Sequence, residues 1–126
     1  MKLTTILAAA AVTMAPAASA WRLYIYNWED QNKAGGYYTN SGPGNPGRAC
    51  HSVSSALNNK GSSIEYYAGN RQSNPTTRCG LKLYDGAGCT GASTSEYRYD
   101  VKMNLAPLLE GWNNRVSSFS TNCYLV

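Results

Sequence analysis

Short stretches of alternating residues recur along the chain between turn-rich segments. Residues 23–26 (LYIY), 81–84 (LKLY) and 96–99 (EYRY) show this alternation, which is typical of half-buried β-strands. In the second stretch the two leucines would face one side of the strand and the lysine the other. The pattern predicts an all-β domain of short strands joined by tight turns.

The remaining segments read mostly as connections. Residues 103–110 predict a helix, which Pro107 limits to about one turn. Residues 38–48 and 69–77 are rich in Gly, Pro, Asn and Ser and are predicted to be loops. The second loop divides the domain near its middle.

The N-terminal residues 1–20 have the layout of a secretory signal. Lys2 precedes an apolar run, and Ala18-Ser19-Ala20 provides the small residues that suit a signal peptidase. The run is shorter than the roughly 20 residues that span a bilayer, so we expect no membrane anchor. Cleavage before Trp21 would release one domain, residues 21–126, into the extracellular medium.

Charge and cysteine content narrow the function classes. The chain has eleven basic residues against seven acidic, and removal of Lys2 leaves a net charge of +3. The basic residues are scattered singly, which does not favour nucleic-acid binding. Four cysteines in an exported chain predict two disulfides rather than a metal site, with three connectivities open. They are Cys50, Cys79, Cys89 and Cys123.

A polar hexad occurs twice. The sequence Asn-Asn-Lys-Gly-Ser-Ser at residues 58–63, the first hexad, returns fifty-five positions later as Asn-Asn-Arg-Val-Ser-Ser at residues 113–118, the second hexad. At the same offset Gly36 meets Gly91, and an insertion of about three residues in the first copy brings residues 23–26 opposite residues 81–84. The chain is therefore predicted to contain two half-domains of like design.

The second copy suggests how one unit folds. Residues 85–88 (Asp-Gly-Ala-Gly) would turn the hairpin back, since glycines permit positive φ. Gly91 would allow close backbone approach, and the hydroxyl of Ser118 would bond the backbone of the folded hairpin. Val116 and Phe119 would continue into the core.

The pattern Tyr84-x-x-x-x-Cys89-x-Gly91, followed by Trp112-Asn-Asn-x-x-Ser-Ser-Phe119, resembles the Greek-key motif of the βγ-crystallin superfamily, especially its microbial and fungal secreted members. The resemblance spans residues 21–126. It departs at Cys89, where the family usually has an aromatic residue, and in the first hairpin, which is longer. It implies a sandwich of two four-stranded sheets that exchange one strand, with Greek keys at about 21–70 and 78–126.

In that family the hexad is a calcium-binding signature, and two copies form a paired site. The resemblance implies hydroxyl ligands from the fifth-position serines and carbonyl ligands from the third positions. All four Asn/Asp positions are Asn, and the third positions are basic, so we expect weak binding near the millimolar range. Alternatively, the hexads act only as turns with serine ties. The implied site comprises Asn58, Asn59, Lys60, Ser62, Asn113, Asn114, Arg115 and Ser117.

The crystallin-like topology also brings Cys79 near Cys123, which leaves Cys50 to pair with Cys89. A Cys50–His51 dyad is the one combination resembling an active site. Neighbouring strand residues point to opposite faces, and Cys50 is expected to be oxidised, so no enzymatic activity is predicted.

The resemblance suggests three roles for an exported domain of this kind. The first is a binding or structural module with cell-wall or cell-surface partners, with or without calcium. The others are a killer-toxin-like antimicrobial effector and an inhibitor of a secreted protease that would use residues 38–48. Four tyrosines, if exposed, could contact carbohydrate or protein, although paired tyrosines of a strand more often lie one inward and one outward. They are Tyr37, Tyr38, Tyr66 and Tyr67.

Overall fold

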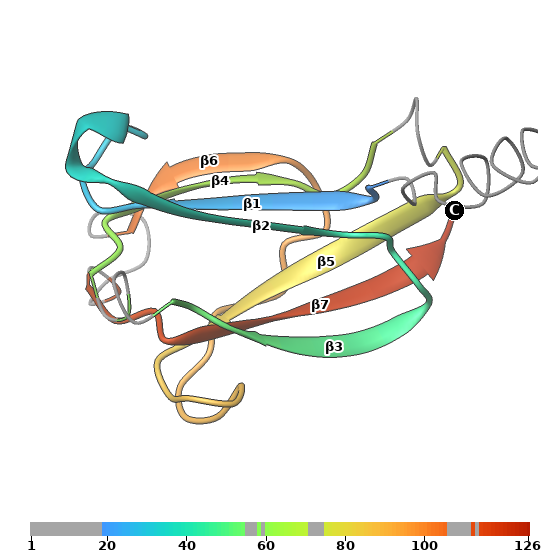
Figure 1. Cartoon of the computed structure of the whole chain (residues 1–126). Helices are drawn as coiled ribbons and strands as arrows, with labels where there is room; N and C mark the ends of the chain where they lie inside the picture. Colours follow the sequence, from blue (N-terminus) through green and yellow to red (C-terminus); the bar gives the residue numbers. More distant parts are fainter. Residues whose placement is uncertain (1–18, 55–57, 59, 71–74, 106–111, 113) are drawn as a thin grey trace, which may run out of the picture.

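The computed structural model describes residues 19–54, 58, 60–70, 75–105, 112 and 114–126. In this part the chain forms two antiparallel sheets stacked face to face (Figure 1). The strands are β1 (Trp21–Tyr26), β2 (Tyr37–Gly42), β3 (Gly47–Ser52), β4 (Ser63–Tyr67), β5 (Thr77–Tyr84), β6 (Val101–Asn104) and β7 (Ser118–Leu125), with a 3-10 helix, η1, at Lys33–Gly35.

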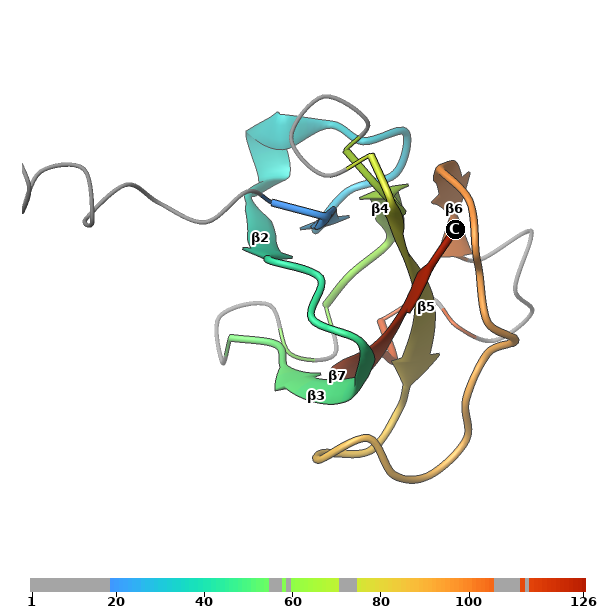
Figure 2. The same ribbon diagram turned by 90° about the vertical axis from the view of Figure 1, so that its right-hand side faces the viewer.

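The two halves of the chain exchange a strand. The first sheet has the order β2-β1-β4-β6 and the second the order β3-β7-β5. Strand β6 comes from the second half yet pairs with β4, and β3 comes from the first half yet pairs with β7. Figure 2 shows the two layers from the end, with β3 and β6 on the sheets of the opposite halves. The all-β, two-sheet Greek-key sandwich is confirmed.

The second sheet has three strands rather than the four that the resemblance implied. Residues 93–97 lie where the fourth strand would run, but they contribute only isolated bridges to Tyr84 and Leu81. The ladder breaks at Leu83, whose N–H donates to the Thr94 hydroxyl (3.1 Å) rather than to a backbone carbonyl. The predicted strand at residues 96–99 is wrong: only Tyr97 pairs with β5, and the next N–H along β5, that of Cys79, donates instead to the Ala68 carbonyl (2.8 Å).

The core lies between the sheets and follows the predicted alternation. Its centre is fully buried, and each such aliphatic or aromatic side chain stabilises the fold by about 1.5–3 kcal/mol. Lys82, between two of these residues, points to the outer face. The central residues are Leu23, Ile25, Ile64, Leu81, Leu83 and Phe119.

Two predicted connections turn out to be strands. Residues 38–42 and 47–48 lie in β2 and β3, so only residues 43–46 link the two sheets. Met103 and Asn104, predicted as helix, pair with Ile64 and Ser63 on β4. In both cases backbone pairing with a neighbouring strand outweighs local turn or helix propensity. Leu105 is helical, as predicted, and residues 106–110 of the predicted helix lie outside the described residues.

Two disulfides close the fold. Cys79–Cys123 joins β5 to β7, with Cα atoms 3.9 Å apart, and Cys50–Cys89 joins β3 to the second hairpin, with Cα atoms 6.0 Å apart. This is the pairing that the crystallin-like topology implies. Among the described residues, no helix combines the length and apolar character needed to cross a bilayer. Residues 1–18 of the predicted signal lie outside the described residues.

Candidate functional site

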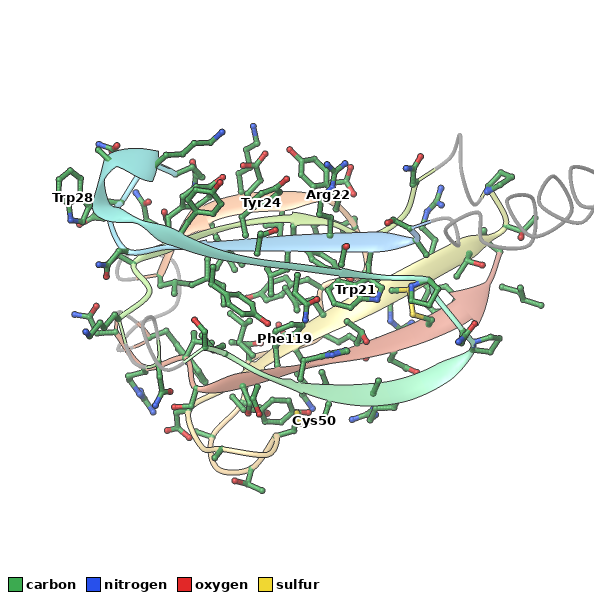
Figure 3. The ribbon with its side chains drawn as sticks, viewed as in Figure 1. Trp21, Arg22, Tyr24, Trp28, Cys50 and Phe119 are labelled. Carbon is green, nitrogen blue, oxygen red and sulfur yellow. A yellow bond between two sulfur atoms is a disulfide. The ribbon has the colours of Figure 1, made fainter. Side chains whose placement is uncertain are left out.

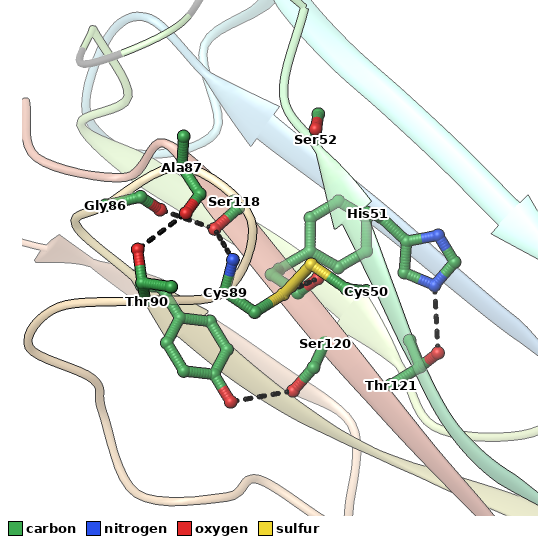
Figure 4. Close-up of a disulfide and its surroundings, with 12 residues drawn as sticks. Cys50, His51, Ser52, Gly86, Ala87, Cys89, Thr90, Ser118, Ser120 and Thr121 are labelled. Atoms are coloured by element: carbon green, nitrogen blue, oxygen red, sulfur yellow. Dashed lines mark hydrogen bonds between the residues drawn. A yellow bond between two sulfur atoms is a disulfide. The ribbon is translucent and has the colours of Figure 1, made fainter.

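The last serine of each hexad ties a folded hairpin to the sandwich. The Ser118 hydroxyl donates to the Gly86 carbonyl (2.6 Å) and accepts from the Cys89 N–H (2.8 Å), as Figure 4 shows. Ser63 does the same in the first half, where its hydroxyl donates to the Trp28 carbonyl (2.7 Å) and accepts from the Gln31 N–H (3.0 Å). Both serines are fully buried. The tie predicted for Ser118 is present in both halves.

The hairpins held by these serines share unusual backbone conformations. Gln31 and Cys89 have φ of 55° and 58°, and Gly36 and Gly91 have φ of 89° and 82°. A Cβ at Gly91 would lie 2.3 Å from an Asp85 side-chain oxygen, which accounts for the predicted close approach. The sequence repeat thus corresponds to a repeat of backbone conformation in the two hairpins.

The two hexads touch each other at one end of the sandwich. The Asn114 N–H donates to the Gly61 carbonyl (2.8 Å), which joins the second hexad directly to the first. The fifth-position serines are anchored alike, since the Ser62 N–H donates to the Tyr26 carbonyl (2.8 Å) and the Ser117 N–H to the Tyr84 carbonyl (2.9 Å). The arrangement places the hexads as an adjoining pair.

The side chains of the two hexads differ in their exposure to solvent. The Ser62 side chain is buried, and within the described part of the chain its hydroxyl has no hydrogen-bond partner. The side chains of Asn58, Lys60 and Asn114 are exposed. Ser117 is half-buried. Asn59 and Asn113 lie outside the described residues.

A basic side chain of the second hexad is held beside the hairpin. The Arg115 guanidinium pairs with the Asp85 carboxylate at 2.7 Å and lies 4.9 Å from the Trp112 ring centre. The hydrogen bond from Arg115 is the main reason that the pKa of Asp85 lies below its usual value. The Asp85 carboxylate is therefore engaged by the second hexad's own arginine.

The donor set suits a hard cation better than a transition metal. No group of three or more His, Cys, Asp or Glu side chains comes together among the described residues. Calcium accepts hydroxyl, amide and carbonyl oxygens as ligands. The buried Ser62 hydroxyl, which has no hydrogen-bond partner among the described residues, fits such a role, because a buried polar group without a partner is destabilising unless something satisfies it.

Cys50 and His51, rejected as a catalytic dyad on the sequence alone, are engaged separately on β3. Cys50 is joined to Cys89, so it offers no thiol. His51 points inward, with its ring centre 4.8 Å from that of Phe119 and 5.0 Å from that of Trp21, and its Nε2 lies 3.0 Å from the Thr121 hydroxyl (Figure 4). Burial lowers the pKa of His51 below its ordinary value. These contacts give His51 a packing role in the core.

Sequence reasoning missed Gln31. Its side-chain amide donates to the Ile64 carbonyl (3.2 Å) and to the Met103 carbonyl (3.4 Å), so it links the first hairpin to β4 and β6. The signal was available: the offset that aligns residues 23–26 with 81–84 also places Gln31 opposite Cys89.

Comparison with known proteins adds one solved structure. No family model matches the chain, and no curated protein matches it. The crystal structure of the N-terminal domain of Protein S is similar at 21% identity with a TM-score of 0.45, covering 83% of this chain and 97% of that chain. The repeat geometry, the exchanged strands and the paired serine ties therefore rest on this chain's own structure.

Proposed function

We propose that this protein is an exported binding or structural module whose paired hexads form a weak calcium site. The observation that carries the proposal is the direct contact between the hexads, the hydrogen bond from Asn114 to Gly61. This bond joins two segments fifty-five positions apart, which supports a site that draws ligand oxygens from both hexads. Two disulfides and a predicted secretory signal suit an oxidising, calcium-containing compartment.

Charge determines how tightly such a site would bind. Calcium affinity rises with the number of anionic ligands, and the hexads contribute none. Arg115 further neutralises the Asp85 carboxylate (2.7 Å). The proposed site therefore belongs in the millimolar range of extracellular modules, about 10⁻⁴ to 10⁻³ M.

Calorimetric titration of the chain beginning at Trp21 tests the proposal. We expect saturable heat with calcium in that range and a rise in melting temperature, because a ligand that binds only the folded state stabilises it. Ser62→Ala should remove most of the heat, whereas the matched variant Ser52→Ala, at an exposed serine of β3, should not. No heat and no thermal shift at several millimolar calcium would overturn the site.

Arg115→Gln sharpens the same test. It removes the cation and releases the Asp85 carboxylate, so calcium should bind several-fold more tightly than to the unaltered chain. Weaker binding would mean that Arg115 organises the site rather than opposing the ion. Lys60→Gln, at the equivalent and exposed position of the first hexad, serves as the comparison because no described carboxylate pairs with it.

A further inference from the structure

The outer face of the first sheet is lined with tyrosines and charged residues. Alternation with the buried residues of β1 turns Arg22, Tyr24 and Tyr26 outward, and the strand register places Tyr37, Glu65, Tyr67 and Lys102 on the same side. Figure 3 shows Arg22 and Tyr24 standing away from the core. We call this surface the tyrosine face: Arg22, Tyr24, Tyr26, Tyr37, Glu65, Tyr67 and Lys102.

The rings of this face are held in place before any ligand arrives. Tyr24 stacks on Tyr26, with centres 6.1 Å apart and planes 15° from parallel, and Tyr37 lies 6.1 Å and 5.7 Å from the two. Tyr26 is 1% exposed, whereas Tyr37 is 45% exposed. Tyr26 is therefore a buried neighbour against which the Tyr24 ring stacks, whereas Tyr24 is partly exposed and Tyr37 is exposed.

The single carboxylate of the face is fully engaged. Glu65 accepts hydrogen bonds from the hydroxyls of Tyr26 (2.8 Å) and Tyr67, and the Lys102 ammonium lies 3.6 Å away. Burial alone would raise the pKa of Glu65, but these donors hold it below its usual value. The Glu65 carboxylate is therefore already paired with groups of the protein itself.

Arg22 is a cation of this face that forms no ion pair with a described residue. Its guanidinium lies 5.4 Å from the centre of the Tyr67 ring. Arg22 and Tyr67 also line a cavity of about 290 Å³ together with Gly69 and Asn70, and the segment Ser19–Trp21 completes its lining. Cleavage of the predicted signal would open this cavity further. The face therefore combines flat aromatic rings with an available planar cation.

We propose that the tyrosine face binds an acidic polysaccharide. The C–H faces of pyranose rings are apolar and would pack on Tyr24 and Tyr37, as flat apolar groups do on aromatic rings. A uronate carboxylate would pair with the Arg22 guanidinium, whose fork matches carboxylate geometry. The outward residues of this face include no large aliphatic side chain to anchor a protein partner. The inference rests on the proposed role as an exported binding module and does not depend on calcium.

The test compares two polymers that differ only in charge. Calorimetry with polygalacturonate should give saturable binding to the chain beginning at Trp21, and fully methyl-esterified polygalacturonate should bind roughly tenfold more weakly, since it lacks the carboxylate. Arg22→Gln should reduce binding of the acid about tenfold and leave the ester unchanged. Tyr24→Ala should weaken both.

Arg48→Gln is the matched control, because Arg48 is an exposed arginine of β3 on the opposite sheet. Equal effects of the two arginine variants would show attraction to net charge alone and would overturn the site. Equal binding of acid and ester would overturn the charge assignment. Equal binding to anionic lipid vesicles would overturn the polysaccharide as ligand.

Calcium titration of the same preparation separates this inference from the proposed calcium site. A protein that binds polygalacturonate but not calcium would overturn the calcium site alone. A protein that binds calcium but neither polymer would overturn the polysaccharide inference alone. Thermal unfolding of each variant shows that it is folded before it is scored.

Discussion

The two halves of this molecule fold the same hairpin but secure it with different chemistry. In both, a buried serine holds the turn through two hydrogen bonds. The turn residue that donates its N–H to this serine has a positive φ, and it is Gln31 in the first half and Cys89 in the second. Gln31 donates its amide to the carbonyls of β4 and β6, whereas Cys89 is bonded covalently to Cys50 on β3.

The halves share a link from the hairpin turn to the exchanged strand, and they differ in the chemical group that makes this link. Both hairpins need a connection from the turn to the exchanged strand, which is β6 in one sheet and β3 in the other. The amide serves with hydrogen bonds worth about 1 kcal/mol each, whereas the disulfide also restricts the unfolded chain. The second half should therefore depend on its connection more than the first.

The largest expected effect is loss of the disulfide between hairpin and β3. Cys50→Ala with Cys89→Ala should lower the free energy of unfolding by about 2–4 kcal/mol, because it frees a loop of intermediate length in the unfolded chain. The cysteines are 39 positions apart. Urea unfolding measures the change, and a loss below about 1 kcal/mol would contradict a structural role for this bond.

The serine ties come next. Ser63→Ala or Ser118→Ala leaves a part-buried N–H and a part-buried carbonyl without their partner, so each should cost about 1–2 kcal/mol. Hydrogen exchange should then distinguish the halves: the Gln31 amide should lose protection in Ser63→Ala, while the Cys89 amide keeps more protection in Ser118→Ala because the disulfide still holds it. Equal loss at both amides would remove the proposed difference.

Gln31→Ala should have a smaller effect. The variant loses two hydrogen bonds of 3.2 Å and 3.4 Å, for an expected cost of about 0.5–1.5 kcal/mol. Urea unfolding measures it, with Gln31→Glu as the matched variant, since a carboxylate of similar shape cannot donate to the two carbonyls. If Gln31→Glu were as stable as the unaltered protein, the amide would not be the connection.

The repeat also suggests that the disulfide of the second half could be introduced at the equivalent positions of the first half. Glu65 pairs with Lys102 as Ser120 pairs with Cys50, so Lys102 is the counterpart of Cys50. Gln31→Cys with Lys102→Cys should form a third disulfide, detected by mass spectrometry before and after reduction. Two free thiols under oxidising conditions would show that the halves are less alike than their backbones indicate.

The smallest expected effect concerns His51, whose counterpart in β6 is Met103. Burial lowers the pKa of His51 in the folded protein, so the unfolded chain takes up the proton first as pH falls below about 6.5. The stability that neutral His51 provides is present above that pH and is lost as pH falls through its lower folded value. His51→Met should flatten the dependence of the urea midpoint on pH below about 6.5. An unchanged slope would contradict burial of this ring.

Much of the fold could be predicted because it depends on local pattern and repetition. The alternation in residues 23–26 and 81–84 identified β1 and β5, and the paired glycines and serines marked the two turns. The tyrosine pairs divide as expected: Tyr66 is fully buried, and Tyr37 faces outward. These features follow from the strand period of two and from the conformational needs of a turn.

The remainder could not be predicted because it depends on contacts between distant segments. The Pro- and Gly-rich stretch around residue 43 resembles a loop, yet β2 continues to Gly42 because β1 pairs with it. The Glu96–Tyr99 region alternates like a strand, yet the N–H of Cys79 that would continue its pairing donates to the Ala68 carbonyl. The Arg115–Asp85 ion pair likewise joins a hexad to a hairpin thirty residues away.

The pairing of the hexads is tested most directly by a calcium titration followed through amide ¹H–¹⁵N chemical shifts. The account predicts that the amides of both hexads, including Gly61, Ser62, Asn114 and Ser117, shift together with one midpoint near the millimolar range, and that amides of the tyrosine face do not move. Shifts confined to one hexad, or none at either, would contradict the claim that the two form a single site.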